Sequence, residues 1–486
     1  MRSSFGGINI GITALWAQQK SLDVTGHNIS NVNTPGYSRQ MVIHASTQPS
    51  TIGRSGSNQI MQMGTGVGVQ EIRQYRDEFL DIKLRREIKE FGYWEARQSS
   101  IEELETIFND NSEEGLQTVM NNMWNSWSQL SKPTGGLTAR SLVKESAIAF
   151  IDTVKNLDLM LTNFRKHKDK ELKENVTKVN DMASRIAEMN YKIKQVESNG
   201  SRANDFRDER ERLINELSKM ASVQVIDSDT VNIALEGCLL VDDTKVNKLV
   251  TMTENAADGY SVVKWANTLD KLTISGGSIK ALIDTRDELV EGFRERLNQF
   301  VIGVSREINT LHHNGRGNKD DVQRYMFVVE NNDADGINVN LSNISLHSQL
   351  IDVNNIAAAT SSPPGNYEDN TNALAISELR YQDFFSDTLY IAAPGPDRKY
   401  NSDEFYRNLI SDVGIKGMEA KTSAESQAIL VEQIENRRQS LMAVSLDEEM
   451  SNLIRFEHSY NAAARIVNAM DEMLEIIVNK VGLGGR

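Results

Sequence analysis

Several residue types are scarce in this sequence, and each shortage argues against a class of protein or site. Cys238 is the only cysteine among 486 residues, so no disulfide can form within the chain. Basic residues number 53 against 68 acidic ones, and the net charge of -15 argues against a nucleic-acid partner, because phosphate contacts need clustered Lys and Arg. No apolar run reaches the roughly 18 residues that a membrane span requires, so membrane insertion is not expected.

The beginning of the sequence also lacks the features of a cleavable signal peptide. The stretch from Met1 to Lys20 has no charged start followed by an apolar block and a small-residue cleavage site. The overall composition, 39% hydrophobic and 25% charged, is ordinary for a folded protein. A chain of this length can form roughly two to four domains with apolar cores of their own.

Both ends of the sequence carry apolar residues at alternating spacings of three and four, which is the pattern of a coiled coil. Near the C-terminus the stripe consists of Leu453, Phe456, Tyr460, Ala463, Val467, Met470, Leu474, Ile477 and Val481. Near the N-terminus it consists of Phe5, Ile8, Ile12, Leu15, Leu22 and Ile29, interrupted by Gln19 and Gly26. Each end therefore predicts a helix that packs against another helix, either in the same chain or in another one. The N-terminal 45 residues are net basic and residues 441–486 net acidic, which favours pairing the two ends.

Between the ends, helical and strand patterns alternate. A turn-rich stretch reaches Gly68, and helical patterning then dominates to Met220. Residues 223–278 alternate as half-buried strands do, with Asp258-Gly259 as a hairpin turn, and the helical period returns from 279 to 314. Residues 317–400 contain four of the seven prolines and short strand patterns at 326–329 and 337–341. Helical patterning resumes near Ser402.

These patterns predict an α+β multidomain fold. A long α-helical coiled-coil or bundle core would be formed by both termini and a helical domain, with β-rich insertions projecting outward. We expect residues 1–45 and 446–486 to form the terminal helical core. Residues 46–316 and 401–445 would form a helical domain with a small β insertion at about 221–278, and residues 317–400 an outer, loop-rich and strand-rich domain.

Two motifs could suggest chemistry, and a structural interpretation is favoured for both. Gly64, Gly66 and Gly68 lack the Lys-Ser/Thr of a phosphate-binding loop and the spacing of a dinucleotide fingerprint, so we expect a turn into a strand. The adjacent His312 and His313 have no second His or Cys pair at metal-ligand spacing, so a solvated helix end is expected. No motif predicts a cofactor or a catalytic site.

The first predicted helix closes on a dense group of short polar and turn residues: Asn28, Ser30, Asn31, Asn33, Thr34, Pro35, Gly36 and Tyr37. This stretch resembles the N-terminal signature shared by rod, hook and hook-associated proteins of the bacterial flagellum. The glycine-rich entry at 64–80 and the tail at 444–481 are similar to further parts of that family. Residues 203–218 and 282–290 are most similar to its hook-associated members.

The resemblance implies a structural junction protein that polymerises at the distal end of the hook and connects hook to filament. The terminal stripes would then be an assembly interface in the inner core. The implied partners are further copies of the chain, the hook protein, a second hook-associated junction protein, and a cytoplasmic export chaperone at the C-terminal helix. The implied location is extracellular, on the flagellum, reached through the flagellar type III apparatus without a cleaved signal peptide.

Two alternatives remain open at this point. The chain could be another flagellar axial component, such as a hook or rod protein, because the N-terminal signature alone does not separate these. An enzyme displayed on the flagellum would need a catalytic arrangement in the outer region. Residues 317–399 offer carboxylates and one histidine, His347, in no recognisable arrangement.

Overall fold

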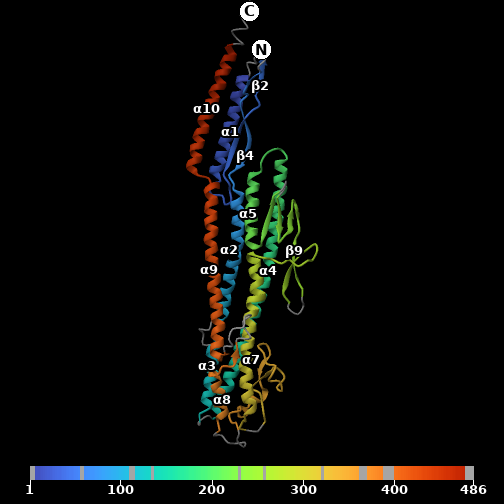
Figure 1. Cartoon of the computed structure of the whole chain (residues 1–486), viewed down its shortest axis with the longest axis vertical. Helices are drawn as coiled ribbons and strands as arrows, with labels where there is room; N and C mark the ends of the chain where they lie inside the picture. Colours follow the sequence, from blue (N-terminus) through green and yellow to red (C-terminus); the bar gives the residue numbers. More distant parts are fainter. Residues whose placement is uncertain are drawn as a thin grey trace, which may run out of the picture.

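The chain folds into a long rod (Figure 1). Its first helix, α1 (Gly6–Ser30), and its last helix, α10 (Leu446–Ile476), lie side by side at one tip of the rod. The computed structural model describes residues 6–54, 60–108, 115–132, 136–227, 231–254, 259–318, 322–360, 369–386 and 399–476. The loops and short strands that follow α7 (Val290–Asn314) lie at the opposite tip (Figure 1). The chain thus runs out along the rod and returns, as its sequence pattern predicted.

Two antiparallel strand pairs follow α1. β1 (Gln40–Ser46) pairs with β4 (Val67–Gln74), and β2 (Ser50–Arg54) pairs with β3 (Ile60–Met63). The first pair runs beside α1, where the Ser21 hydroxyl lies 3.0 Å from His44 Nε2. The sequence pattern showed only turns before Gly64, so the strands before β4 were not predicted. A division at residue 45 would cut through the β1–β4 pair.

The rod is built from α2 (Glu78–Ile107), α3 (Leu116–Leu130), α4 (Leu137–Glu197), α5 (Asn204–Met220), α6 (Gly277–Asp284), α7, α8 (Thr371–Glu378) and α9 (Ser402–Met442). The 61-residue α4 contains no glycine or proline. It is followed directly by the predicted stop Asn199-Gly200, where Gly200 has a φ of 79°. α2 begins at Asp77, whose carboxylate accepts hydrogen bonds from Phe79 N and Leu80 N. No helix within the described residues is long and apolar enough to cross a membrane.

The rod contains two separate apolar cores. The core far from the termini includes Trp124, Trp127, Phe150 and Phe300, each at most 2% exposed. The core nearer the termini joins α4 and α5 to the β insertion, with buried residues such as Leu213, Ile233 and Trp265. The insertion confirms the predicted strands.

The β insertion consists of a sheet and a hairpin. β5 (Val223–Asp227), β6 (Val231–Leu235), β7 (Cys238–Asp242) and β8 (Lys245–Val246) form an antiparallel sheet in that order. β9 (Leu249–Thr253) pairs with β10 (Ser261–Trp265). Gly259 in their connection has a φ of 69°, which suits a turn, whereas the predicted partner Asp258 lies outside the described residues.

A polar layer separates the two cores. On α4, Lys168 and Asp169 are buried, and Arg286 reaches Asp169 from the π-helical segment η1 (Thr285–Leu289) with an Nη1 to Oδ1 distance of 2.5 Å. Asp169 also accepts hydrogen bonds from Ser261 N and Oγ. Burial acts to raise the pKa of the Asp169 carboxyl, but its interactions with Lys173, Ser261 and Arg286 together hold it below the usual value. Both α4 and the α6–η1–α7 run continue through this layer.

The described residues between 317 and 400 pack into the far core, and no separate apolar core lies among them. β11 (Phe327–Val329) pairs with β12 (Ile344–Leu346), and Phe327 and Ile344 are buried among residues of α3, α4 and α7. Short 3-10 turns lie at η2 (Ser348–Ile351), η3 (Val353–Asn355) and η4 (Leu379–Tyr381), and β13 (Phe385–Ser386) pairs with β14 (Lys399–Tyr400).

Two local predictions in this region were wrong. The strand predicted at 337–341 is a series of turns, because Asp335 Oδ1 accepts hydrogen bonds from Ile337 N and Asn338 N, and Asn340 Oδ1 does the same for two following amides. His312 is fully buried and not solvated. Its Nδ1 lies 2.8 Å from Arg324 O and its Nε2 accepts from Ala357 N, and burial lowers the pKa of His312 to about 4.

Candidate assembly site at the terminal helix pair

The two terminal helices approach closely because α1 presents glycine to α10. A Cβ atom at Gly11 would lie 2.6 Å from Val467 Cγ2, and one at Gly7 would lie 2.6 Å from Met470 Cε. A side chain at Gly11 would push against Val467, whereas one at Gly7 would displace the flexible end of Met470. The Gly-x-x-x-Gly spacing of residues 7 and 11 is a small-residue signal that an analysis of apolar stripes does not detect.

The predicted stripe on α10 is the face that turns toward α1. Ala463 is buried, and the other members within the described side chains are half-buried: Leu453, Phe456, Tyr460, Val467, Met470 and Leu474. Ile477 and Val481 lie outside the described residues. The regular spacing therefore identified the more protected face of α10, and within this chain that face is partly covered by α1.

The N-terminal stripe does not contain the most buried positions of α1. Ile12 is 37% exposed, whereas Ile8, Leu15, Leu22 and Ile29 are half-buried, and Phe5 lies outside the described residues. The buried positions of α1 are instead Gly11, Ala17, Ser21, Val24, Thr25 and Asn28. Small and polar residues occupy them because α1 is enclosed by α10 on one side and by β1 and β4 on another.

A second face of α10 remains exposed along the length of the helix. It carries Leu446, Met450, Ile454, His458, Ala462, Ile466, Ala469, Met473 and Ile476, spaced by three or four residues and all exposed. The large apolar side chains among them are 48 to 52% exposed. Apart from His458 these residues are apolar, and those from Ile454 to Ile476 share one face of the helix, whereas Leu446 and Met450 lie further round it. An exposed apolar face of this kind is the pattern of a surface that packs against other helices.

The signature residues build the joint at the base of this pair. Asn28 is buried; its amide donates to Gln40 O and to Glu449 Oε2, and its Oδ1 accepts from the Tyr37 hydroxyl. Asn28 therefore ties α1, the signature loop, β1 and α10 together. Burial raises the pKa of Tyr37 above its usual range, so its hydroxyl remains a donor.

The other signature residues shape the exposed loop. Asn31 donates to His27 O and Thr34 donates to Asn31 Oδ1, whereas Gly36 adopts a φ of 80° that glycine tolerates. Ser30 donates to Gly26 O, and Asn33 and Pro35 are exposed.

Ion pairs close the same joint. Arg39 contacts Glu449 and Glu448, both at 2.6 Å, and Arg39 N donates to Met442 O at the end of α9. The pairing of a basic N-terminal region with an acidic C-terminal one was expected from the charge of the two ends. α9 ends at Met442 and α10 begins at Leu446, so the two are separate helices joined by a short non-helical connection.

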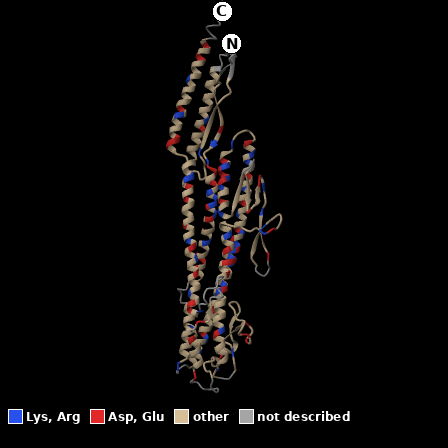
Figure 2. Cartoon of the chain, viewed as in Figure 1, with Lys and Arg blue, Asp and Glu red and all other residues tan. Residues whose placement is uncertain are grey.

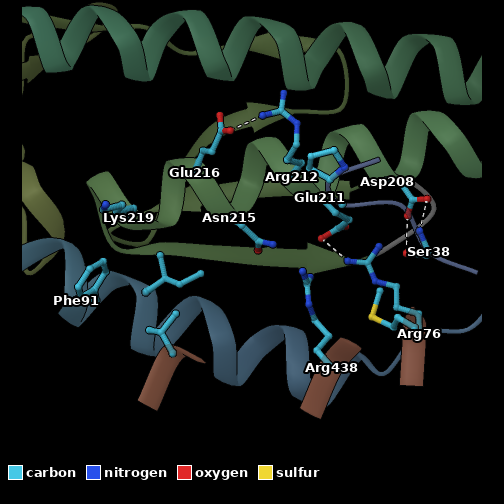
Figure 3. Close-up of a pocket in the computed structure, with 15 residues that line it drawn as sticks. Ser38, Arg76, Phe91, Asp208, Glu211, Arg212, Asn215, Glu216, Lys219 and Arg438 are labelled. Atoms are coloured by element: carbon cyan, nitrogen blue, oxygen red, sulfur yellow. Dashed lines mark hydrogen bonds and ion pairs between the residues drawn. The ribbon is translucent and has the colours of Figure 1, made fainter. Parts of the chain in front are cut away.

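Below the joint, the signature loop meets the rod over a cavity of about 330 Å³ (Figure 3). Figure 3 shows Ser38 directed toward Asp208 and Arg76 toward Glu211, with Phe91 at the other end of the cavity. Asp208 accepts hydrogen bonds from Ser38 N and Oγ at 3.0 and 2.7 Å. Burial nevertheless raises the pKa of Asp208 to about 6.

The charges around this joint are largely matched in pairs. Arg76 also contacts Asp81 at 2.6 Å, and Arg438 reaches the same carboxylate at 3.4 Å. In Figure 2 acidic and basic residues lie close together along the rod. In α1, by contrast, Lys20 is the only Lys or Arg and Asp23 the only Asp or Glu. Among the described residues, no group of His, Cys, Asp or Glu could hold a metal ion. The arrangement is suited to holding helices in place.

Three family models of flagellar proteins match different parts of the chain. Residues 101–327 match the family model of the flagellar hook-associated protein FlgK helical domain. Residues 8–37 match the flagella basal body rod protein family, and residues 440–480 the C-terminal family of flagellar basal body rod FlgEFG proteins.

Individual relatives extend this similarity over the full chain. Flagellar hook-associated protein 1 of Bacillus subtilis is 29% identical over 100% of both chains. The protein of the same name from Escherichia coli is 24% identical over 97% of this chain and 99% of its own. The solved flagellar hook junction protein FlgK from Burkholderia pseudomallei has a similar fold, with a TM-score of 0.62 and 14% identity, covering 75% of this chain and all of that one.

Proposed function

Since the chain belongs to the family of flagellar hook-associated protein 1, a structural family of the bacterial flagellum, we propose that it polymerises at the distal end of the hook and connects the hook to the filament. The match of residues 101–327 to a hook-associated helical domain favours this role over that of a hook or rod protein. The work of the protein is then geometric, and we propose no catalytic activity for it.

The exposed apolar row on α10 is the observation that carries the assembly role. The row runs from Leu446 to Ile476, and α1 packs mainly against the other face, although a Cβ atom at Gly11 would also lie 3.7 Å from Ile466 Cγ2. Burying one large apolar side chain contributes about 1.5 to 3 kcal/mol, so covering the row with helices of neighbouring copies would stabilise an assembly strongly. We therefore assign the contact between copies to this row, and the predicted stripe at Val467 and Met470 mainly to the contact with α1.

The family implies further partners for the two ends of the junction. We propose the hook protein on one side and a second hook-associated junction protein on the other, with further copies of this chain around the ring. We also propose export through the flagellar type III apparatus to an extracellular position, without a cleaved signal peptide. An export chaperone would bind α10 before assembly, and the exposed row would suit it because an isolated apolar face needs cover.

A single substitution on the row tests the proposal. Ile454→Asp places a charge on an exposed position, so the free protein should fold as before. In the ring the same carboxylate would be buried without a partner, and the protein should be missing from isolated hooks. Cells should then release filament protein into the medium. Glu457→Gln, at an exposed polar position of α10, is the control and should leave incorporation unchanged. Normal amounts of Ile454→Asp on isolated hooks would contradict the proposal.

A further inference from the structure

One aromatic side chain on α1 is largely exposed. Trp16 is 75% exposed, although indole is among the side chains that gain most from burial. Ile12 and Lys20 lie four residues before and after it and are exposed too, so the three share one face of α1. This face presents a large aromatic group flanked by an aliphatic and a cationic one.

A concave site of matching chemistry lies at the start of α2. A cavity of about 480 Å³ is lined by Tyr75, Asp77, Glu78, Phe79 and Leu441, together with Arg76. Phe79 is 72% and Leu441 50% exposed, so exposed apolar side chains line part of this open cavity, beside charged ones. Arg76 is engaged by Asp81 and Glu211, which leaves the rim acidic through Asp77 and Glu78. We call this site the elbow cavity, because it lies where α9 ends before α10.

We propose that Trp16 of one copy of the chain docks into the elbow cavity of a second copy, with Lys20 beside Asp77 and Glu78. The inference rests on the proposed assembly function. Trp16 is not covered by the elbow cavity of its own chain, because it remains mostly exposed. The two surfaces are different parts of the same molecule, so their contact is head-to-tail and can repeat from copy to copy around a ring or helix.

Charge and anchor chemistry favour a second copy as the occupant. The net-basic N-terminal segment of one copy would meet the acidic rim of the cavity on the next copy. This attraction favours one alignment of the two copies over others. Tryptophan in an apolar pocket is a frequent centre of binding energy in protein interfaces. Trp16 lies fourteen residues before the end of α1 at Ser30, or about 21 Å along the helix.

A charge exchange on isolated hooks tests the contact. Lys20→Glu and Glu78→Lys should each reduce the amount of full-length protein retained at hook ends about tenfold, because each places like charges together. The double variant should recover to near the wild-type amount. Trp16→Ala and Phe79→Ala should also lose about tenfold, with thermal unfolding unchanged, because both side chains are exposed in the free chain. Tyr381→Ala, which removes an aromatic group that is 76% exposed at the opposite tip, should behave as wild type.

Several outcomes would overturn the proposal. A double variant no better than the single ones would exclude the pairing of Lys20 with the acidic rim. Normal retention of Phe79→Ala beside poor retention of Trp16→Ala would place Trp16 against another surface, such as the exposed row of α10. If wild type is retained and all variants match it, only this contact fails. If wild-type protein is absent from hook ends, the proposed function itself fails and this contact with it.

Discussion

The terminal helix pair and the middle rod are both made of long helices, yet they differ in how much apolar surface they bury. In the rod, aromatic residues such as Trp124, Trp127 and Phe300 are at most 2% exposed. In α10, the buried residues are Glu449 and Ala463, one of them a charged group in the joint. The rod completes its cores within one chain, whereas the terminal pair leaves a face that only other helices can cover.

The difference follows from the number of layers. The rod encloses its cores between several helices and, nearer the termini, a small sheet. The terminal pair has two helices and a strand pair, which can cover one face of α10 and no more. Its close contact depends on glycine, so it gains little from the burial of large side chains. We therefore expect substitutions in the rod to change global stability and substitutions in the terminal pair to act locally.

The largest effect is expected in the far core of the rod. Phe300 is fully buried, with ring centroids 5.9 Å from those of Phe385 and Phe405. Phe300→Ala should lower the free energy of unfolding by about 3 to 5 kcal/mol, because it leaves a cavity among aromatic rings. Chemical denaturation measures this. A loss below about 1 kcal/mol would show that the rod core is no better packed than the terminal pair.

The polar layer between the two cores provides the next test. Arg286→Met should cost about 3 kcal/mol, because Asp169 would remain buried without its closest cationic partner. Lys173 contacts the same carboxylate at 2.8 Å but is 49% exposed, so Lys173→Met should cost less than about 1 kcal/mol. Denaturation of the two variants should differ accordingly. Equal losses would mean that the layer is as accessible to solvent as the surface.

A smaller and local effect is expected in the terminal pair. Gly11→Leu should separate α1 from α10, because even a Cβ would come within 2.6 Å of Val467. We expect a cost of about 1 to 3 kcal/mol, confined to the two helices and visible as faster amide exchange there. Gly26→Ala is the control: nothing lies within 4 Å of its Cβ position, and the change should slow exchange slightly. Faster exchange throughout the rod in Gly11→Leu would remove the distinction between the regions.

The remaining effect concerns the joint and appears only as the pH changes. The pKa of Asp208 is raised from 3.8 to about 6, so the folded state favours the protonated carboxyl. The resulting stability is present below about pH 4 and is lost as the pH rises through about 6. Carboxyls with lowered pKa values, such as Asp169 and Glu211, act in the opposite direction. The wild type should therefore lose stability relative to Asp208→Asn between pH 4 and 7. Parallel curves for the two proteins would contradict this.

The sequence predicted what depends on regular spacing. The stripe on α10, the helical period of α4 and the alternating strands after Met220 were found because one face of each element is apolar and the other polar. The opposite charges of the two ends also predicted their pairing, now visible as contacts of Arg39 with Glu448 and Glu449.

The sequence did not predict features in which small or polar residues make the contact. Gly7 and Gly11 carry no apolar side chain, so an analysis of apolar stripes could not identify them as contacts with α10. The ring nitrogens of buried His312 hydrogen-bond with Arg324 O and Ala357 N. These partners lie 12 and 45 residues away in the sequence, so the residues around His312 do not indicate its burial. The turns at 337–341 arise from Asp and Asn side chains that compete with strand pairing.

The hydrogen bond between Asn28 and Glu449 joins residues 421 positions apart, which bears on the order of folding. Closing so long a loop directly from the unfolded chain is slow compared with forming contacts between near neighbours. Once α2 and α9 have packed against each other, however, the starts of both terminal segments are already held together, as the contact of Arg39 N with Met442 O shows. The rod therefore acts as a template, and the terminal pair should form last in time and open first.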